Sequence, residues 1–168
     1  MAKEGNTPRL FVVGVGNLLL KDEGVGIHVV RRLREDPRPL PPEVSLIEAG
    51  LPGVGLLELL EKADGMVLID AARMNKAPGT VIRFSPEELM DKPQGASFSS
   101  HDLKLPEVFA LARSLSLMPR SVAIIGIEPG EISWGMELTP EVASSLPRVI
   151  ELVNNELSSW CLPPKSDL

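Results

Sequence analysis

Short apolar runs alternate along the chain with longer stretches in which apolar residues recur every three or four positions. The short runs are typical of buried strands, and they lie at residues 9–14, 43–50, 65–72, 79–85 and 121–130. The longer stretches are typical of amphipathic helices, and they lie at residues 24–34, 54–63, 106–115 and 140–157. The pattern therefore predicts strands and helices in alternation.

This alternation favours an α/β fold. Strands that alternate with helices usually form a mostly parallel sheet with helices on both faces. We therefore expect a single domain over residues 1–168, built on a twisted sheet of five strands, with a core at about 9–157 and a loose tail at 158–168. In such folds ligands bind outside the carboxyl ends of the strands, so the candidate site residues are sought there.

The amino-acid composition and net charge limit the classes of binding partner that we expect. The chain has 23 acidic and 17 basic residues, a net charge of −6, and its Lys and Arg residues form no cluster. Binding to nucleic acid or to an anionic membrane surface depends on clustered cations, so neither is expected. No apolar stretch approaches the ~20 residues that span a bilayer, and the first ten residues lack the apolar core of a signal peptide. We expect a cytoplasmic monomer.

Residues 13–26, VGVGNLLLKDEGVG, look at first like a glycine-rich nucleotide-binding loop. A dinucleotide fingerprint needs the pattern G-x-G-x-x-G, with each glycine required for steric reasons. Gly14 and Gly16 fit this pattern, but Leu19 occupies the third glycine position. We therefore interpret the two glycines as a tight turn at the end of a strand, and a nucleotide site as the weaker alternative.

The acidic pair Asp22 and Glu23 also argues against a phosphate site, because two carboxylates would repel a pyrophosphate. For Asp22 we expect a structural role, since an acid in the first turn of a helix stabilises that helix by about 0.3–1 kcal/mol. For Glu23 two interpretations stay open. It has either the same helical role or a role as a ligand at the rim of the sheet.

Two further candidate ligands stand at the expected ends of elements. Asp70 follows the apolar sequence MVLI, where an aspartate is disfavoured, and His101 lies in a polar turn before a predicted helix. The other histidine, His28, lies within a helix and is expected to pack or to face solvent. Taken alone, Asp70 could cap a turn and His101 could be a turn residue. Together with Glu23 they form an O, O, N set that suits Zn, Fe or Ni and leaves positions open.

Four segments carry a resemblance to a known family. GVGNLLLKDEGVG, VLIDAAR, FSSHDL and GIEPGEISWGMELTPEV occur in the order and relative positions of the motifs of the hydrogenase maturation endopeptidases. The chain resembles this family from about Arg9 to Leu157. A minor departure is the acid at position 23, which is Glu here and Asp in many members. The resemblance implies a three-layer α/β/α fold.

The resemblance also implies an activity. The family removes a C-terminal extension from the large-subunit precursor of a nickel–iron hydrogenase after nickel insertion, and its members are sometimes classed as aspartic-type peptidases. The residues that match its metal-contacting positions are Glu23, Asp70 and His101, which we expect to be both catalytic and nickel-contacting. The enzyme would hold no metal of its own and would recognise nickel bound in the precursor. Gly50, in a loop that matches a family segment near the cleft, either shapes substrate access or serves an ordinary turn.

Other chemistries find less support in the sequence. Cys161 is the single cysteine, in the predicted tail, and Ser99 and Ser100 lack the G-x-S-x-G context of a serine nucleophile. An aspartic-protease dyad of the two carboxylates would leave His101 without a role. The main alternative function is a non-catalytic maturation factor of the same fold, which binds a metal or the precursor without cutting it.

The segment before the last predicted helix holds two large apolar residues, Trp134 and Met136. They either cover the edge of the sheet or contact the substrate, and both interpretations stay open. Thr139 and Pro140 are predicted as the N-cap and the first residue of the helix that follows.

Overall fold

The structure is a computed structural model that describes residues 7–50, 53–91, 97–98 and 104–161. The strands that these residues form are β1 (Leu10–Val15), β2 (Val44–Gly50), β3 (Gly65–Arg73), β4 (Val81–Phe84), β5 (Ser97–Phe98) and β6 (Ser121–Ile127). The helices are the 3-10 turn η1 (Lys21–Gly24), α1 (Val25–Glu35), α2 (Gly55–Lys62), α3 (Pro86–Asp91), α4 (Leu105–Ser114) and α5 (Pro140–Cys161). All five strands and all four helices that the pattern predicts are therefore present.

The sheet has the strand order β2-β1-β3-β6-β4. Strands β2, β1, β3 and β6 run parallel, whereas β4 pairs antiparallel with β6. The predicted mostly parallel sheet is thus confirmed. A sixth strand that was not predicted, β5, pairs antiparallel with the last residues of β3. With two residues, β5 is too short to produce a pattern in the sequence.

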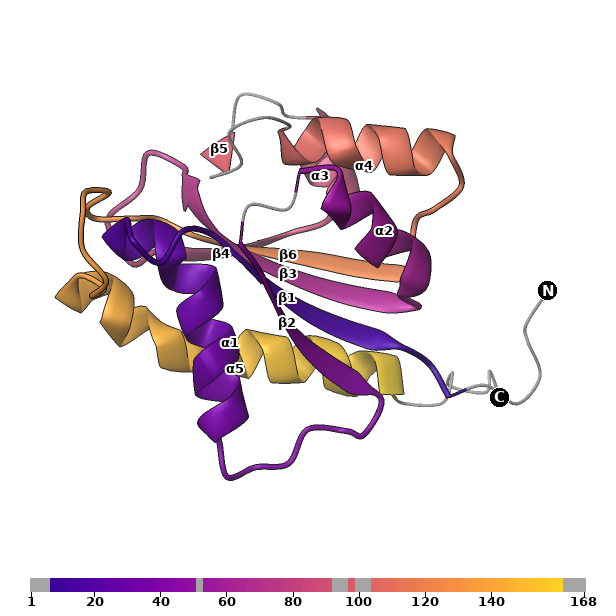
Figure 1. Ribbon diagram of the computed structural model, residues 1–168, viewed down its shortest axis with the longest axis horizontal. Coiled ribbons are helices and arrows are strands. Elements are labelled where there is room, and N and C mark those ends of the chain that lie inside the picture. Colours follow the sequence, from indigo (N-terminus) through magenta and orange to yellow (C-terminus); the bar gives the residue numbers. More distant parts are fainter. Residues whose placement is uncertain (1–6, 51–52, 92–96, 99–103, 162–168) are drawn as a thin grey trace, which may run out of the picture.

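Helices cover both faces of the sheet and make the fold three-layered. Helices α1 and α5 lie on one face, and α2, α3 and α4 lie on the other (Figure 1). Helix α3 was not predicted, because it spans six residues and buries only two of them, too few for a helical period. Helix α5 reaches Cys161, so the residues expected to begin the loose tail at 158 belong to this helix. In the described part of the chain, no helix has both the length and the apolarity needed to cross a membrane.

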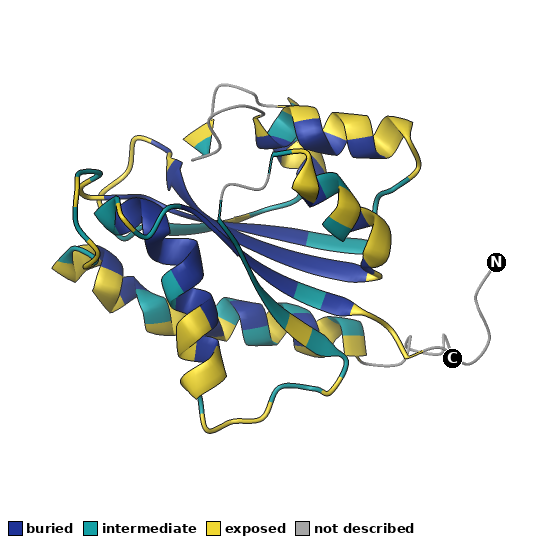
Figure 2. Cartoon of the chain, viewed as in Figure 1, coloured by how far each residue is buried: buried dark blue, intermediate teal, exposed yellow. Residues whose placement is uncertain are grey.

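Strand β3 forms the centre of the core. Residues 65–72 are all buried, which explains why apolar residues occupy nearly every position of this strand (Figure 2). Side chains alternate along the strand: Val67 and Ile69 join the cluster under α1 and α5, while Met66 and Leu68 join the cluster under α2 and α4. A residue two positions beyond Leu68 therefore projects toward the α2 and α4 face.

Helix α1 begins in backbone contact with the sheet. A Cβ atom on Gly14 of β1 would overlap the carbonyl oxygen of Gly26 in α1. A Cβ atom on Gly26 would in turn overlap the carbonyl oxygens of Val15 and Ile69. Only glycine permits this approach, which places η1 and the start of α1 against the carboxyl ends of β1 and β3.

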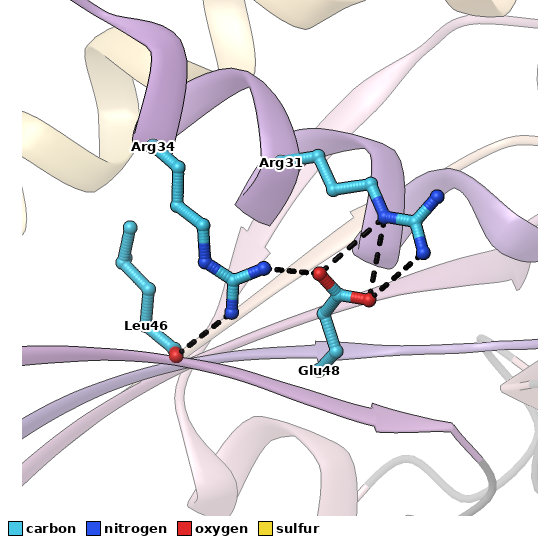
Figure 3. A network of polar contacts seen from close by, with 4 residues as sticks. All are labelled: Arg31, Arg34, Leu46 and Glu48. Atoms are coloured by element: carbon cyan, nitrogen blue, oxygen red, sulfur yellow. Dashed lines mark hydrogen bonds and ion pairs between the residues drawn. The ribbon is translucent and has the colours of Figure 1, made fainter.

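An ion-pair network fastens the other end of α1 to the edge strand β2 (Figure 3). Arg31 and Arg34 of α1 both bind the Glu48 carboxylate, with Arg31 Nη2 at 3.1 Å from Glu48 Oε2. Arg34 also donates to the carbonyl oxygen of Leu46 at 3.2 Å. The hydrogen bonds that the Glu48 carboxylate accepts, chiefly from Arg31 and then from Arg34, lower the pKa of Glu48. The network fastens the C-terminal half of α1 to the edge of the sheet.

We predict that Gly26→Ala destabilises the protein by about 3 kcal/mol, the upper part of the range for overpacking, because the overlapped atoms are backbone oxygens. Urea unfolding followed by circular dichroism measures the change. Gly55→Ala is the matched control, since its Cβ would meet nothing within 4 Å at the start of α2. This control should be neutral or stabilising by up to about 1 kcal/mol. Equal stability of both variants would contradict the close contact.

Candidate functional site

The carboxyl ends of the parallel strands gather several segments at one edge of the sheet. Turn η1, the loop from β6 to α5, and β5 all lie at this edge (Figure 1). The isolated bridge between Leu20 and Gly135 joins the first two of these segments. Ligands of parallel α/β folds bind at this edge, so the geometry agrees with the region indicated by the sequence.

Asp70 lies within β3 at the point where its pairing with β1 has ended. Its register partner is Gly126 in β6, while the last β1–β3 pair joins Gly14 and Ile69. The Asp70 side chain is fully buried, and the alternation along β3 directs it to the α2 and α4 face. Asp70 is thus a buried carboxylate at the edge of the sheet where ligands of parallel α/β folds bind.

Glu23 lies in η1 and is also buried. Its backbone N–H donates to the carbonyl oxygen of Leu20 at 3.1 Å. Gly16, with a φ of +139°, lies so close that a Cβ atom there would overlap the carbonyl oxygen of Glu23. The glycines of the 13–26 segment therefore let the chain turn and place Glu23 beside the end of β3, as the sequence predicted.

His101, the third predicted ligand, lies outside the described residues, as do Ser99 and Ser100. Helix α4 begins at Leu105, four residues further along the chain. Within the residues that the structure describes, no three His, Cys, Asp or Glu side chains gather in a way that could hold a metal. The meeting of His101 with Glu23 and Asp70 stays a prediction.

Asp22 has a different role from the one predicted. Its carboxylate does not support the first turn of α1 but accepts four hydrogen bonds from the β6–α5 loop and from the residue before α5. The donors are Gly130 N at 2.8 Å, Glu131 N at 2.9 Å, Thr139 N at 2.8 Å and Thr139 Oγ1 at 2.7 Å. The Thr139 hydroxyl thus donates to Asp22, while Pro140 begins α5 as predicted. Asp22 ties the segment that carries Glu23 to the start of α5.

Glu128 is a buried acid at this edge that the sequence analysis did not single out. Its Oε2 atom accepts hydrogen bonds from Met74 N at 2.6 Å and from Lys76 N at 3.3 Å. Its backbone also exchanges hydrogen bonds with Gly79 and Thr80. Glu128 therefore fixes the loop between β3 and β4. The sequence signal for this role was a lone acid after the apolar strand SVAIIGI.

The sequence analysis expected His28 of α1 either to pack or to face solvent, and the structure shows that it packs. The half-buried imidazole forms a hydrogen bond with the backbone of Met136. Burial lowers the pKa of His28, an effect strengthened by Arg31 and opposed by the Met136 hydrogen bond and by Asp22. The neutral imidazole is thus part of the support for the β6–α5 loop.

The remaining predicted features have mixed outcomes. Trp134 is 81% exposed, so the interpretation that it covers the sheet edge is wrong.

Gly50 has a φ of +56°, open space around its Cα, and a carbonyl oxygen that accepts a hydrogen bond from Gly16 N at 2.8 Å. This conformation favours glycine and fits a turn, while a role in substrate access stays a prediction. Cys161 is the exposed last residue of α5.

Two shallow hollows of about 340 and 390 Å³ lie elsewhere, around the loop that follows α1. Asp36 and Arg38, which line both, form an ion pair with each other at 2.7 Å. This region is at the C-terminal end of α1, away from Glu23 and Asp70, and no buried carboxylate lines either hollow. The two buried acids Glu23 and Asp70 at the carboxyl edge therefore remain the better candidate site.

Comparison with known proteins identifies relatives over most of the chain. The sequence profile of the hydrogenase maturation protease family matches residues 27–156. The chain is 31% identical over 153 residues to the hydrogenase expression/formation protein HupD of Rhodobacter capsulatus, covering 90% of this chain and 72% of that protein. It is 32% identical over 146 residues to the hydrogenase 2 maturation protease of Escherichia coli K12, covering 86% and 88% of the two chains.

The fold has close counterparts among solved structures. The hydrogenase maturating endopeptidase HybD from Escherichia coli superposes with a TM-score of 0.81 at 29% sequence identity. The superposition covers 91% of this chain and 94% of that chain. The layers and strand order described above are therefore those of a solved endopeptidase.

We predict that Asp22→Asn lowers the free energy of unfolding by about 2–4 kcal/mol, because an amide cannot accept all four hydrogen bonds and adds a donor among donors. Chemical denaturation measures the change. Glu131→Gln is the control: it breaks an exposed ion pair with Lys21 and should cost less than about 1 kcal/mol. If Asp22→Asn were as stable as wild type, the proposed linking role of this carboxylate would be wrong.

A second prediction concerns acid stability. Because burial lowers the pKa of His28 in the folded state, the unfolded chain takes up this proton first as the pH falls below 6.5. The contribution of His28 is complete above that pH and is lost on acidification. Wild type should therefore lose more unfolding free energy between pH 7.5 and 5.5 than His28→Gln does. Parallel curves for the two proteins would contradict this assignment.

Proposed function

The chain belongs to the hydrogenase maturation protease family, and from this premise we propose that it removes the C-terminal extension of a nickel–iron hydrogenase large-subunit precursor after nickel insertion. The family identifies it as a peptidase whose substrate is a hydrogenase precursor. The observation that carries the proposal is the burial of two carboxylates, Glu23 and Asp70, at the carboxyl edge of the sheet.

The donor set suits nickel that arrives with the substrate. Carboxylate and imidazole both bind Ni²⁺, and Glu23, Asp70 and His101 together would supply three ligands. Three ligands leave coordination positions for groups of the precursor. The enzyme would therefore bind nickel well only when the precursor already holds it, which makes cleavage conditional on insertion.

The reaction is hydrolysis of one peptide bond. Water adds to the scissile carbonyl, one proton passes to a carboxylate of the Glu23–Asp70 pair, and the departing amine takes up a proton as the bond breaks. Nickel in the substrate would polarise the carbonyl or lower the pKa of the attacking water. We expect the enzyme to act as a monomer in the cytoplasm.

We predict that Glu23→Gln, Asp70→Asn and His101→Ala each slow precursor trimming at least about 100-fold, because each removes a nickel contact or the proton acceptor. Nickel-loaded precursor is incubated with each variant and the product is weighed by mass spectrometry. Asp64→Asn, just before the opposite end of β3, is the matched control that keeps the wild-type rate. Normal trimming by all three site variants would overturn the proposal.

The same experiment separates the alternatives. If wild type binds the nickel-loaded precursor and leaves its mass unchanged, the protein is a non-catalytic maturation factor. If His101→Ala trims normally while both carboxylate variants fail, the two acids act as an aspartic-type dyad without the histidine.

A further inference from the structure

An exposed apolar patch lies beside the candidate site. It consists of Leu19, 50% exposed, Trp134, 81% exposed, and Met136, 57% exposed. Exposed single apolar residues are common, but these three come from two segments that are joined to each other. Leu19 lies four residues before Glu23 in the chain, and Trp134 and Met136 lie shortly before the start of α5.

Hydrogen bonds hold the two segments together. Gly135 N donates to the carbonyl oxygen of Leu19 at 3.0 Å, and Lys21 N donates to the carbonyl oxygen of Gly135 at 2.8 Å. Asp22 N adds a bond to the carbonyl oxygen of Glu131 at 3.3 Å, next to the four bonds that the Asp22 carboxylate accepts. The apolar side chains are thus presented on a fixed backbone, which reduces the entropy that binding must remove.

The surroundings favour an apolar partner. Lys21, the cation between Leu19 and Glu23, forms an ion pair with Glu131 at 2.7 Å. The hydrogen bond from Lys21 lowers the pKa of Glu131. Lys21 is thus held by this ion pair and is not free to attract an acidic segment to the patch.

We propose that Leu19, Trp134 and Met136 form a docking surface for an apolar segment of the hydrogenase large-subunit precursor. This inference rests on the proposed function, because continuity with the Glu23 segment identifies the occupant: a precursor that reaches Glu23 lies next to the patch. The patch is too small for a stable dimer of this chain. Three side chains at about 200 Å² each remain below the roughly 800 Å² that each partner of a stable complex buries.

The test compares Trp134→Ala/Met136→Ala with Leu111→Ala/Leu115→Ala, a control that removes two exposed leucines, one in α4 and one directly after it. Trimming of nickel-loaded precursor is followed at several precursor concentrations by mass spectrometry. Loss of an aromatic anchor should raise KM roughly 10- to 30-fold, with kcat within about twofold of wild type. The leucine control should keep both constants. Thermal unfolding checks that both variants fold.

An unchanged KM in the Trp134 variant, or an equal rise in the leucine control, would overturn the docking surface. So would a wild-type dimer in analytical ultracentrifugation that the Trp134 variant abolishes, because the occupant would then be a second copy. If wild type does not trim at all, the proposed function fails separately. In that case, calorimetric titration with the same precursor tests whether the patch is a docking surface. If it is, the Trp134 variant binds the precursor with a Kd at least about tenfold weaker than wild type does.

Discussion

Helix α1 starts in direct backbone contact with β1 and β3, and the rest of the site depends on this contact. Glycine at positions 14 and 26 lets carbonyl oxygens approach where a methyl group would overlap them. The contact fixes η1 against the end of β3, and η1 brings Glu23 to the edge where Asp70 lies. A larger residue at either position would move the helix, and with it one of the two carboxylates.

Among the residues that the structure describes, four buried acids lie at this edge of the sheet. Asp22 and Glu128 accept backbone hydrogen bonds and hold the β6–α5 loop and the β3–β4 loop in place. Glu23 and Asp70 lie between these anchored segments. A buried acid at this edge can thus have a structural role that the sequence alone does not reveal.

The amino-acid pattern was enough to predict the fold because the signals are local. The apolar run of β3 indicates a central strand, and the glycines before Glu23 indicate a tight turn. The role of Asp22 could not be predicted, since its partners lie 108 to 117 residues away. Short elements such as α3 and β5 contain too few residues to show a period. Exposure of Trp134 also depends on the loop geometry, which no local pattern encodes.

The strand order has a further consequence. From β1 the chain crosses through α1 on one face to β2, and from β2 it returns through α2 on the other face to β3, on the far side of β1. The chain thus leaves β1 toward β2 on one side and leaves β3 toward β4 and β6 on the other, so β1 and β3 flank a topological switch point, where ligands of open α/β sheets bind. Glu23 follows β1 in the chain, and Asp70 lies within β3 near its carboxyl end. The position of the two buried acids is thus a consequence of the chain's connectivity.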